Sequence, residues 1–82
     1  MTSIHRRFDE LITALGTNIY QLSKDLGHKR PDKFYSIVNG KAKPSYDTIE
    51  EVIRLYPHIN VNWIFRGVGA MFLDKIQEEN GA

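Results

Sequence analysis

The amino-acid sequence predicts an all-α fold, a compact domain of five short helices. Apolar residues recur every three or four positions, which is the spacing of helices that bury one face. Gly16, Gly27 and Gly40 each follow such a segment, where a left-handed residue typically ends a helix. Residues suited to helix starts come shortly after each glycine. Together these observations predict where each helix begins and ends.

The first helix is expected over residues 4–15. Ser3 is its candidate N-cap, and Gly16 supplies its C-terminal stop. One face carries apolar side chains at helical spacing, namely Ile4, Phe8, Leu11, Ile12 and Leu15.

The next two helices are shorter. The second begins at a cap of Thr17 or Asn18 and runs to about Leu26. The third begins at Pro31, because a residue without an N–H suits the first helical position, and it stops at residues 39–40. Its inward side chains are expected to be Phe34, Ile37 and Val38.

The fourth and fifth helices follow the same rules. Ser45 is the expected N-cap of the fourth, and Pro57 ends it by disfavouring helical geometry in the residue before it. Asn60 caps the fifth helix and Gly67 closes it. The apolar positions of these two helices are Ile49, Val52, Ile53 and Tyr56, then Val61, Trp63, Ile64 and Phe65.

The 82 residues predict one domain, with a core at about residues 4–72 and a polar tail at residues 73–82. No apolar run approaches the roughly 20 residues that a membrane span needs. The N-terminal segment lacks the unbroken apolar core of a signal peptide. The sequence contains no cysteine, which excludes disulfides and thiolate metal sites. We therefore expect a cytoplasmic protein that does not span a membrane.

Catalytic and metal-binding chemistry is not indicated. His5, His28 and His58 have no histidine partner three or four residues away, so a zinc site is not expected. The glycines of segment 67–69 lack the remaining residues of a phosphate-binding loop. A domain this small also leaves little room for a substrate pocket of ordinary volume. We expect no enzyme activity, no cofactor and no small-molecule ligand.

The net charge of +1 hides a strong asymmetry along the chain. Residues 24–43 carry six basic and two acidic side chains, a net of +4. Residues 44–82 carry three basic and six acidic side chains, a net of −3. A concentrated basic segment attracts polyanions, whereas an acidic remainder is repelled by them. The alternative is a chance cluster of charges on a solvated face.

The third helix lies inside this basic segment and has two different faces. Its inner face can dock it on the rest of the domain, through apolar residues such as Phe34. Its other side carries Lys29, Arg30, Lys33 and Tyr35, which can enter a groove lined with phosphates. This arrangement predicts a sequence-specific DNA-binding domain of the helix-turn-helix type.

A resemblance to a known family supports this interpretation over about residues 8–72. It is most specific in the segments NGKAKPSYDTIEEVI and YPHINVNWIFRGVGAMF. Ser23 stands where the family usually has alanine, and Gly27 matches the glycine of its turn. Phe34 and Ile37 match the inner positions of the second helix of its motif. On these residues the chain resembles a bacterial branch of the phage-repressor-like helix-turn-helix family, which includes lambda repressor and Cro.

The resemblance implies that the helix at 31–39 lies in the major groove of double-stranded DNA, with the preceding helix crossing above it. It also implies a homodimer on a pseudo-palindromic operator, with half-sites about 34 Å apart, in the bacterial cytoplasm at the nucleoid. The predicted DNA-binding residues are Gln21, Lys29, Arg30, Asp32, Lys33, Tyr35, Ser36, Asn39, Lys41, Lys43, Ser45 and Tyr46.

The charged residues at the start of the third helix have distinct expected roles. Arg30 can donate two hydrogen bonds to guanine O6 and N7 from the helix entrance. Lys33, further along the helix, can reach either a base or a phosphate. Asp32 either selects the amino group of cytosine or pairs locally with Lys29 or Lys33, and we favour local pairing.

The remaining candidates each have two interpretations. Tyr35 either contacts DNA or folds against the second helix. Lys41 and Lys43 either contact phosphates or are solvated charges of a loop. Ser45 offers a helix N-terminus, whose free N–H groups favour an anion.

These observations predict a transcriptional regulator, a phage-type repressor that blocks its operator by occupying it. This requires Arg30 and Lys33 to lie clear of the acidic C-terminal half. The alternative is a protein-interaction module, such as an antitoxin whose acidic half binds a toxin. Dimer contacts are expected from apolar residues assumed to be exposed, namely Ile64, Phe65, Met71, Phe72 and Ile76.

Overall fold

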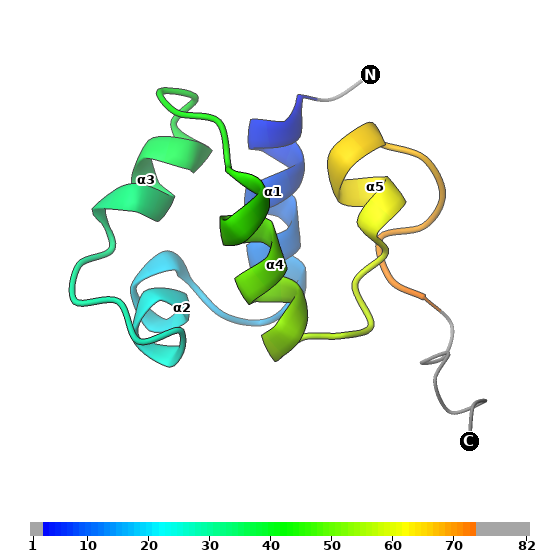
Figure 1. Cartoon of the computed structure of the whole chain (residues 1–82). Coiled ribbons are helices and arrows are strands. Elements are labelled where there is room, and N and C mark those ends of the chain that lie inside the picture. Colours follow the sequence, from blue (N-terminus) through cyan, green and yellow to red (C-terminus); the bar gives the residue numbers. More distant parts are fainter. Residues whose placement is uncertain (1–2, 74–82) are drawn as a thin grey trace.

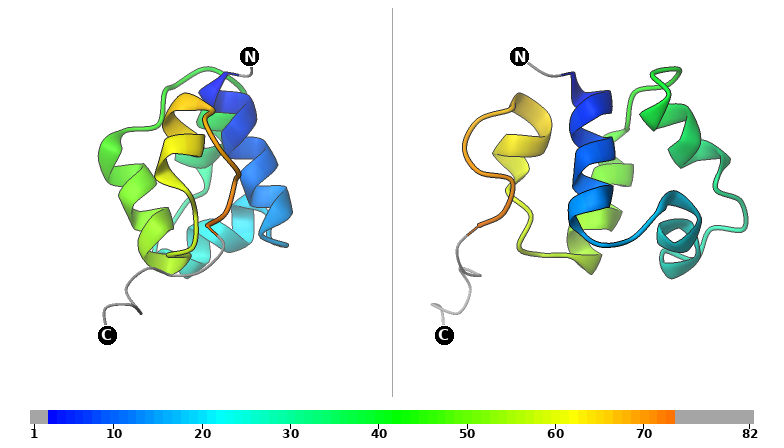
Figure 2. Two further views of the ribbon diagram at one scale, coloured as in Figure 1. Left: turned by 90° about the vertical axis from the view of Figure 1, so that its right-hand side faces the viewer. Right: turned by 180° about the vertical axis from the view of Figure 1, so that it is seen from behind.

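The computed structural model describes residues 3–73, which form five helices and one isolated β-bridge. The helices are α1 (Ile4–Ala14), α2 (Ile19–Asp25), α3 (Asp32–Val38), α4 (Tyr46–Leu55) and α5 (Val61–Arg66). The two longest, α1 and α4, occupy the centre, with α2 and α3 on one flank and α5 on the other (Figure 1). Figure 2 shows the same order from behind, and its side view shows α5 in front of α1 and α4. The all-α prediction is confirmed for the described residues.

Four of the helices begin at a side-chain cap, and all four caps were expected from the sequence. Ser3 and Ser45 each accept a hydrogen bond from a backbone N–H three residues on, at 3.2 and 3.1 Å. Asn18, and not Thr17, caps α2 in the same way at 2.8 Å. Asn60 caps α5 at 3.1 Å. These contacts satisfy amides that the helix itself leaves without a partner.

The start of α3 differs from the prediction by one residue. Pro31 is the N-cap, with φ −86° and ψ 2°, and the first helical residue is Asp32. The carbonyl oxygen of Pro31 accepts hydrogen bonds from the N–H groups of Phe34 at 3.0 Å and Tyr35 at 3.1 Å. Asp32 therefore occupies the first turn, where a carboxylate interacts favourably with the helix dipole.

The predicted glycine stops are confirmed. Gly16, Gly27 and Gly40 have φ angles of 75°, 83° and 81°, in the left-handed region that side chains disfavour. After α2, the N–H of Gly27 donates to the carbonyl oxygen of Lys24 at 3.0 Å, and the next N–H donates to that of Ser23 at 2.9 Å. This pair of bonds is a Schellman motif, and it turns the chain sharply away from the helix axis.

The core draws on all five helices and on the segment before α5. Phe8 of α1 and Phe34 of α3 stack with ring centroids 6.1 Å apart, which fixes α3 to the central helix. Ser23 of α2 is also buried, as expected of a small side chain at a close approach. The buried apolar residues are Phe8, Leu11, Ile12, Leu22, Phe34, Ile37, Ile49, Val52, Ile59 and Ile64.

A buried arginine attaches α5 to α1. Arg7 is only 5% exposed. Its Nε donates to the carbonyl oxygen of Ile64 at 3.0 Å, and its Nη2 donates to that of Phe65 at 3.1 Å. These carbonyls belong to the last turn of a helix, where they lack intrahelical partners and attract a cation.

The segment after α5 folds back beside the segment that precedes it. The N–H of Asn60 donates to the carbonyl oxygen of Met71 at 2.9 Å, and the N–H of Leu73 donates to that of His58 at 2.8 Å. The ring of Phe72 stacks on His58 with centroids 4.9 Å apart. The described chain therefore ends against its own core.

This arrangement corrects the expected dimer contacts. Ile64 is 1% exposed and belongs to the core, so it is unavailable to a partner. Phe65, Met71 and Phe72 are half-buried and pack against the core, so each presents only part of its surface. Ile76 and the rest of the predicted polar tail beyond Leu73 lie outside the described residues.

Candidate nucleic-acid interface

The predicted site lies on the flank formed by α2, α3 and the loops on either side of α3 (Figure 1). Three contacts hold α3 in place. Phe34 and Ile37 are 0% and 2% exposed. His5 of α1 donates from Nδ1 to the carbonyl oxygen of Ile37 at 2.9 Å. The inner face of α3 is thus docked, and Asp32 and Tyr35 lie on its exposed side.

Most of the predicted DNA-binding residues belong to this flank, and of the whole set only Ser36 is half-buried. Ser45 and Tyr46 lie at the start of the central helix α4, and Tyr46 borders a groove between α4 and α5. The others are exposed, namely Gln21, Lys29, Arg30, Asp32, Lys33, Tyr35, Asn39, Lys41, Lys43, Ser45 and Tyr46. A binding surface requires exposed side chains, and these residues meet that requirement. They differ in the contacts that their side chains already make within the chain.

Arg30 and Asp32 form an ion pair with each other. Arg30 Nη2 lies 2.8 Å from Asp32 Oδ2, and the two side chains are 78% and 65% exposed. The expected local pairing of Asp32 is therefore observed, although the expected partner, Lys29 or Lys33, is wrong. Arg30 lies on the other side of Pro31, at the helix entrance, where its guanidinium reaches the first-turn carboxylate. An ion pair this exposed contributes about 0–1 kcal/mol, so a competing ligand can replace either partner.

Lys33 is turned toward the body of the domain. Its Nζ lies 3.5 Å from Glu51 Oε2 of α4 and 5.5 Å from the centroid of the Phe34 ring. Glu51 belongs to the acidic C-terminal half. The requirement that both cations lie clear of that half is met by Arg30 and fails for Lys33.

His28 completes this contact with α4, and sequence analysis missed the role. His28 lies in the connection between α2 and α3. Its Nε2 donates to Glu51 Oε1 at 2.7 Å, and its ring meets the Phe34 ring edge-on at 5.4 Å. His28 and Glu51 are 23 residues apart, so no helical or turn spacing could have related them.

Three cations without a carboxylate partner in the described residues flank α3, and two others, Lys24 and Arg66, lie in the last turns of α2 and α5. Within residues 3–73, the side chains of Lys29, Lys41 and Lys43 form no ion pair. Lys29 lies in the loop before α3, and the other two lie in the loop after it. Lys29, Lys41 and Lys43, in the loops before and after α3, provide a positive potential that attracts a phosphate backbone.

Two exposed polar residues already have local contacts. The Gln21 side-chain amide donates to Asp25 Oδ1 at 2.8 Å, within α2. Ser45 Oγ accepts from the N–H of Thr48 at 3.1 Å and lies 3.0 Å from its hydroxyl. Ser45 therefore caps its own helix.

Tyr35 lies partly against the start of α2 and is partly exposed. Its side chain is 46% exposed, and it borders an open hollow of about 260 Å³ beside the α1–α2 connection. Asn18 and Ile19, at the start of α2, line the same hollow. One side of the ring thus faces α2 while the rest remains accessible to a ligand.

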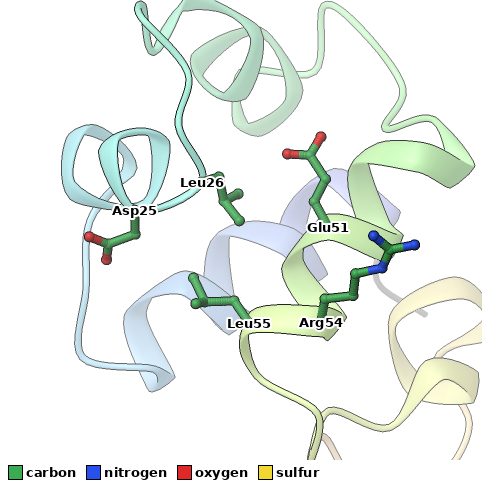
Figure 3. Close-up of a pocket in the computed structure, with 5 residues that line it drawn as sticks. All are labelled: Asp25, Leu26, Glu51, Arg54 and Leu55. Atoms are coloured by element: carbon green, nitrogen blue, oxygen red, sulfur yellow. The ribbon is translucent and has the colours of Figure 1, made fainter.

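A hollow lies between α2 and α4, with a volume of about 330 Å³. Leu26 and Leu55 face each other across it, and Glu51 extends from α4 toward α3 (Figure 3). Asp25 and Arg54 complete its rim. This hollow is open to solvent, and it includes the residue that holds His28 and Lys33.

Other kinds of site find no support in the described chain. Residues 3–73 bring no three histidine, cysteine or carboxylate side chains together as a metal site. Within the same range, none of the helices has both the length and the apolar character that crossing a bilayer requires. Comparison of the chain with protein-family models, curated proteins and solved structures finds no significant match.

Proposed function

We propose that this chain is a sequence-specific DNA-binding regulator of transcription that represses by occupying its operator. In this proposal α2 and α3 act as a helix-turn-helix, and α3 enters the major groove. The observation that carries the proposal is the arrangement of α3: its inner face is locked by Phe34 and Ile37, and unpaired lysines flank its exposed face. The phage-repressor-like sequence pattern supports the same interpretation.

Affinity and specificity come from different residues in this mechanism. Lys29, Lys41 and Lys43 bind phosphates, and the release of condensed counterions supplies affinity without sequence preference. Arg30 supplies specificity from the helix entrance. In the structure Nε and Nη2 of Arg30 both contact Asp32 Oδ2. In the proposed complex this exposed pair gives way to guanine O6 and N7, two acceptors that match the two donors of the guanidinium.

One domain of this size reads only a few base pairs, so we propose a homodimer on a pseudo-palindromic operator. The exposed parts of Phe65, Met71 and Phe72 are the proposed contact. The setting of this function is the bacterial cytoplasm, at the nucleoid.

A protein-interaction module of the antitoxin kind is the second candidate. The observation in its favour is a largely apolar groove of about 160 Å³ between α4 and α5. Tyr46 and Val61 border this groove and are 70% and 46% exposed. A partner protein would cover both side chains, whereas DNA bound along α3 would leave Val61 open.

The test is selection of bound duplexes from a random pool, with the wild type and with Arg30→Ala. We expect the wild type to enrich one motif, and the variant to lose preference at one base pair of each half-site, worth about 1–3 kcal/mol. Arg54→Ala is the matched control, because Arg54 is also an exposed arginine, 77% against 78%, with one carboxylate partner.

Three outcomes would contradict the proposal or the role of Arg30 in it. Failure of the wild type to enrich any motif would remove sequence-specific DNA binding. An unchanged motif with Arg30→Ala would remove Arg30 from the site, and equal effects of the two arginine substitutions would mean that the loss is a non-specific effect of charge.

A further inference from the structure

Glu51 divides its two carboxylate oxygens between two residues of the α2–α3 region. Oε1 accepts the hydrogen bond from His28 Nε2 at 2.7 Å, and Oε2 lies 3.5 Å from Lys33 Nζ. The side chain is 29% exposed, so both contacts are partly shielded from water. One residue of α4 thereby contacts both the loop before α3 and α3 itself.

The position of Glu51 differs from that of every other carboxylate in an ion pair of the described chain. Glu10, Asp32 and Glu50 pair with cations two or four residues away in sequence. Glu51 pairs across 18 and 23 residues, and it reaches from one helix to another (Figure 3). Such a contact restricts the relative position of elements, whereas a pair within one helix does not.

The Glu51 contact also changes the charge that α3 presents. Lys33 is the only lysine of α3, and its ammonium group is neutralised by a carboxylate of another helix. The stem of Lys33 passes the Phe34 ring, with Nζ 5.5 Å from its centroid. The ring and the carboxylate together favour the inward orientation over one that points into solvent.

We infer that Glu51 is a positioning residue for the proposed DNA contact: it fixes the loop before α3 through His28 and withholds Lys33 from phosphate. This inference rests on the proposed function. Affinity for DNA is then carried by the flanking loops, and the body of α3 is left to read bases with few non-specific contacts. A protein with this device has lower affinity for DNA in general and a larger ratio of specific to non-specific binding.

The first experiment measures the dependence of DNA affinity on salt for Glu51→Gln, Lys33→Met and the double variant. Glutamine keeps an oxygen that can accept from His28 but carries no charge. We expect Glu51→Gln to steepen the slope of log K against log salt by about 0.9 per chain, because Lys33 gains a phosphate. Lys33→Met alone leaves the slope unchanged, and the double variant returns to the wild-type slope.

Glu50→Gln is the matched control. Glu50 precedes Glu51 on α4, carries the same charge, and pairs with Arg54 at 3.1 Å within its own helix. It contacts neither His28 nor Lys33 in the described structure. An equal change of slope with Glu50→Gln would overturn the inference, and so would a shallower slope with Lys33→Met alone.

The second experiment needs no DNA, so it separates this inference from the proposed function. Amide hydrogen exchange is compared between Glu51→Ala and Glu50→Ala. We expect exchange at residues 28–38 to accelerate by about three- to tenfold in Glu51→Ala only, the size of one partly exposed hydrogen bond. Failure of the wild type to bind DNA, with this acceleration present, would remove the proposed function and leave Glu51 as a structural clamp. Equal exchange in the two variants would overturn the clamp itself.

Discussion

Ser23 places a hydroxyl group in the core without giving it a hydrogen-bond partner. The residue is 2% exposed, and its Oγ finds no partner within the described chain. Desolvation of a hydroxyl that stays unpaired costs about 1–3 kcal/mol. The small size of the residue is explained by close packing, whereas the hydroxyl has no structural explanation.

We therefore expect Ser23→Ala to increase the free energy of unfolding by about 1 kcal/mol, measured by urea denaturation. The substitution removes an unpaired polar atom and leaves a cavity no larger than that atom. Ser45→Ala is the contrasting variant, since it deletes the N-cap hydrogen bond of α4 and lowers stability by about 1 kcal/mol. A loss of stability with Ser23→Ala would show that the hydroxyl has a partner, such as a buried water.

The stability of helix α5 depends largely on its contact with one side chain of α1, Arg7. The helix has six residues, too few to be stable alone. Arg7 closes its C-terminal carbonyls, while Ile64 packs into the core. Gly67 is required beside this arginine, because a Cβ there would lie 3.2 Å from Arg7 Nη1 and its φ is 73°. The end of α5 is thus specified by two residues that are 60 positions apart in the sequence.

For this helix we predict that Arg7→Met lowers the free energy of unfolding by about 2–4 kcal/mol. Methionine fills much of the space but leaves buried carbonyl oxygens without a donor. Arg6→Met is the control, because Arg6 is 70% exposed and pairs only with Glu10 on the same helix. We expect a change within about 0.5 kcal/mol for this control. Equal losses from the two variants, followed by thermal denaturation, would refute the anchoring role of Arg7.

Across the whole molecule, the lysines that form no ion pair in the described residues lie on one flank. The flank formed by α2 and α3 contains the unpaired lysines, and the opposite flank is formed by α5 (Figure 1). Glu50 and Glu51 of α4, between the two flanks, are occupied by ion pairs with Arg54 and Lys33. We therefore expect a polyanion to approach the α2–α3 flank. The electrostatic potential there depends mainly on the lysines of the two loops that flank α3.

This distribution predicts a steep dependence of DNA affinity on salt. The three cations assigned to phosphates, Lys29, Lys41 and Lys43, imply a slope of about −2.7 for one bound chain and about −5.4 for a dimer. Replacing the three lysines by methionine should remove about 2.7 of that slope per chain. Arg66→Met, on α5, should leave it unchanged. Binding that is insensitive to salt would favour a protein partner over DNA.

Much of the candidate site followed from local patterns. Asn18, Ser45 and the glycine stops act on amides within a few residues, so their roles can be derived from spacing alone. The docked positions Phe34 and Ile37 follow from helical periodicity. The partners of the charged residues could not be derived in this way. Asp32 had several cations within reach, and Glu51 had no sequence relation to His28.

By itself the sequence determined the five helices, their caps and stops, and which side of α3 is buried, because each of these depends on interactions between near neighbours in the chain. Only the tertiary structure decided that Arg7 attaches α5, that Ile64 belongs to the core and that Glu51 holds His28 and Lys33. The physical reason is the separation along the sequence of the residues that interact. A side chain pairs with whatever group packing brings within a few ångströms, and packing joins residues that are distant in sequence.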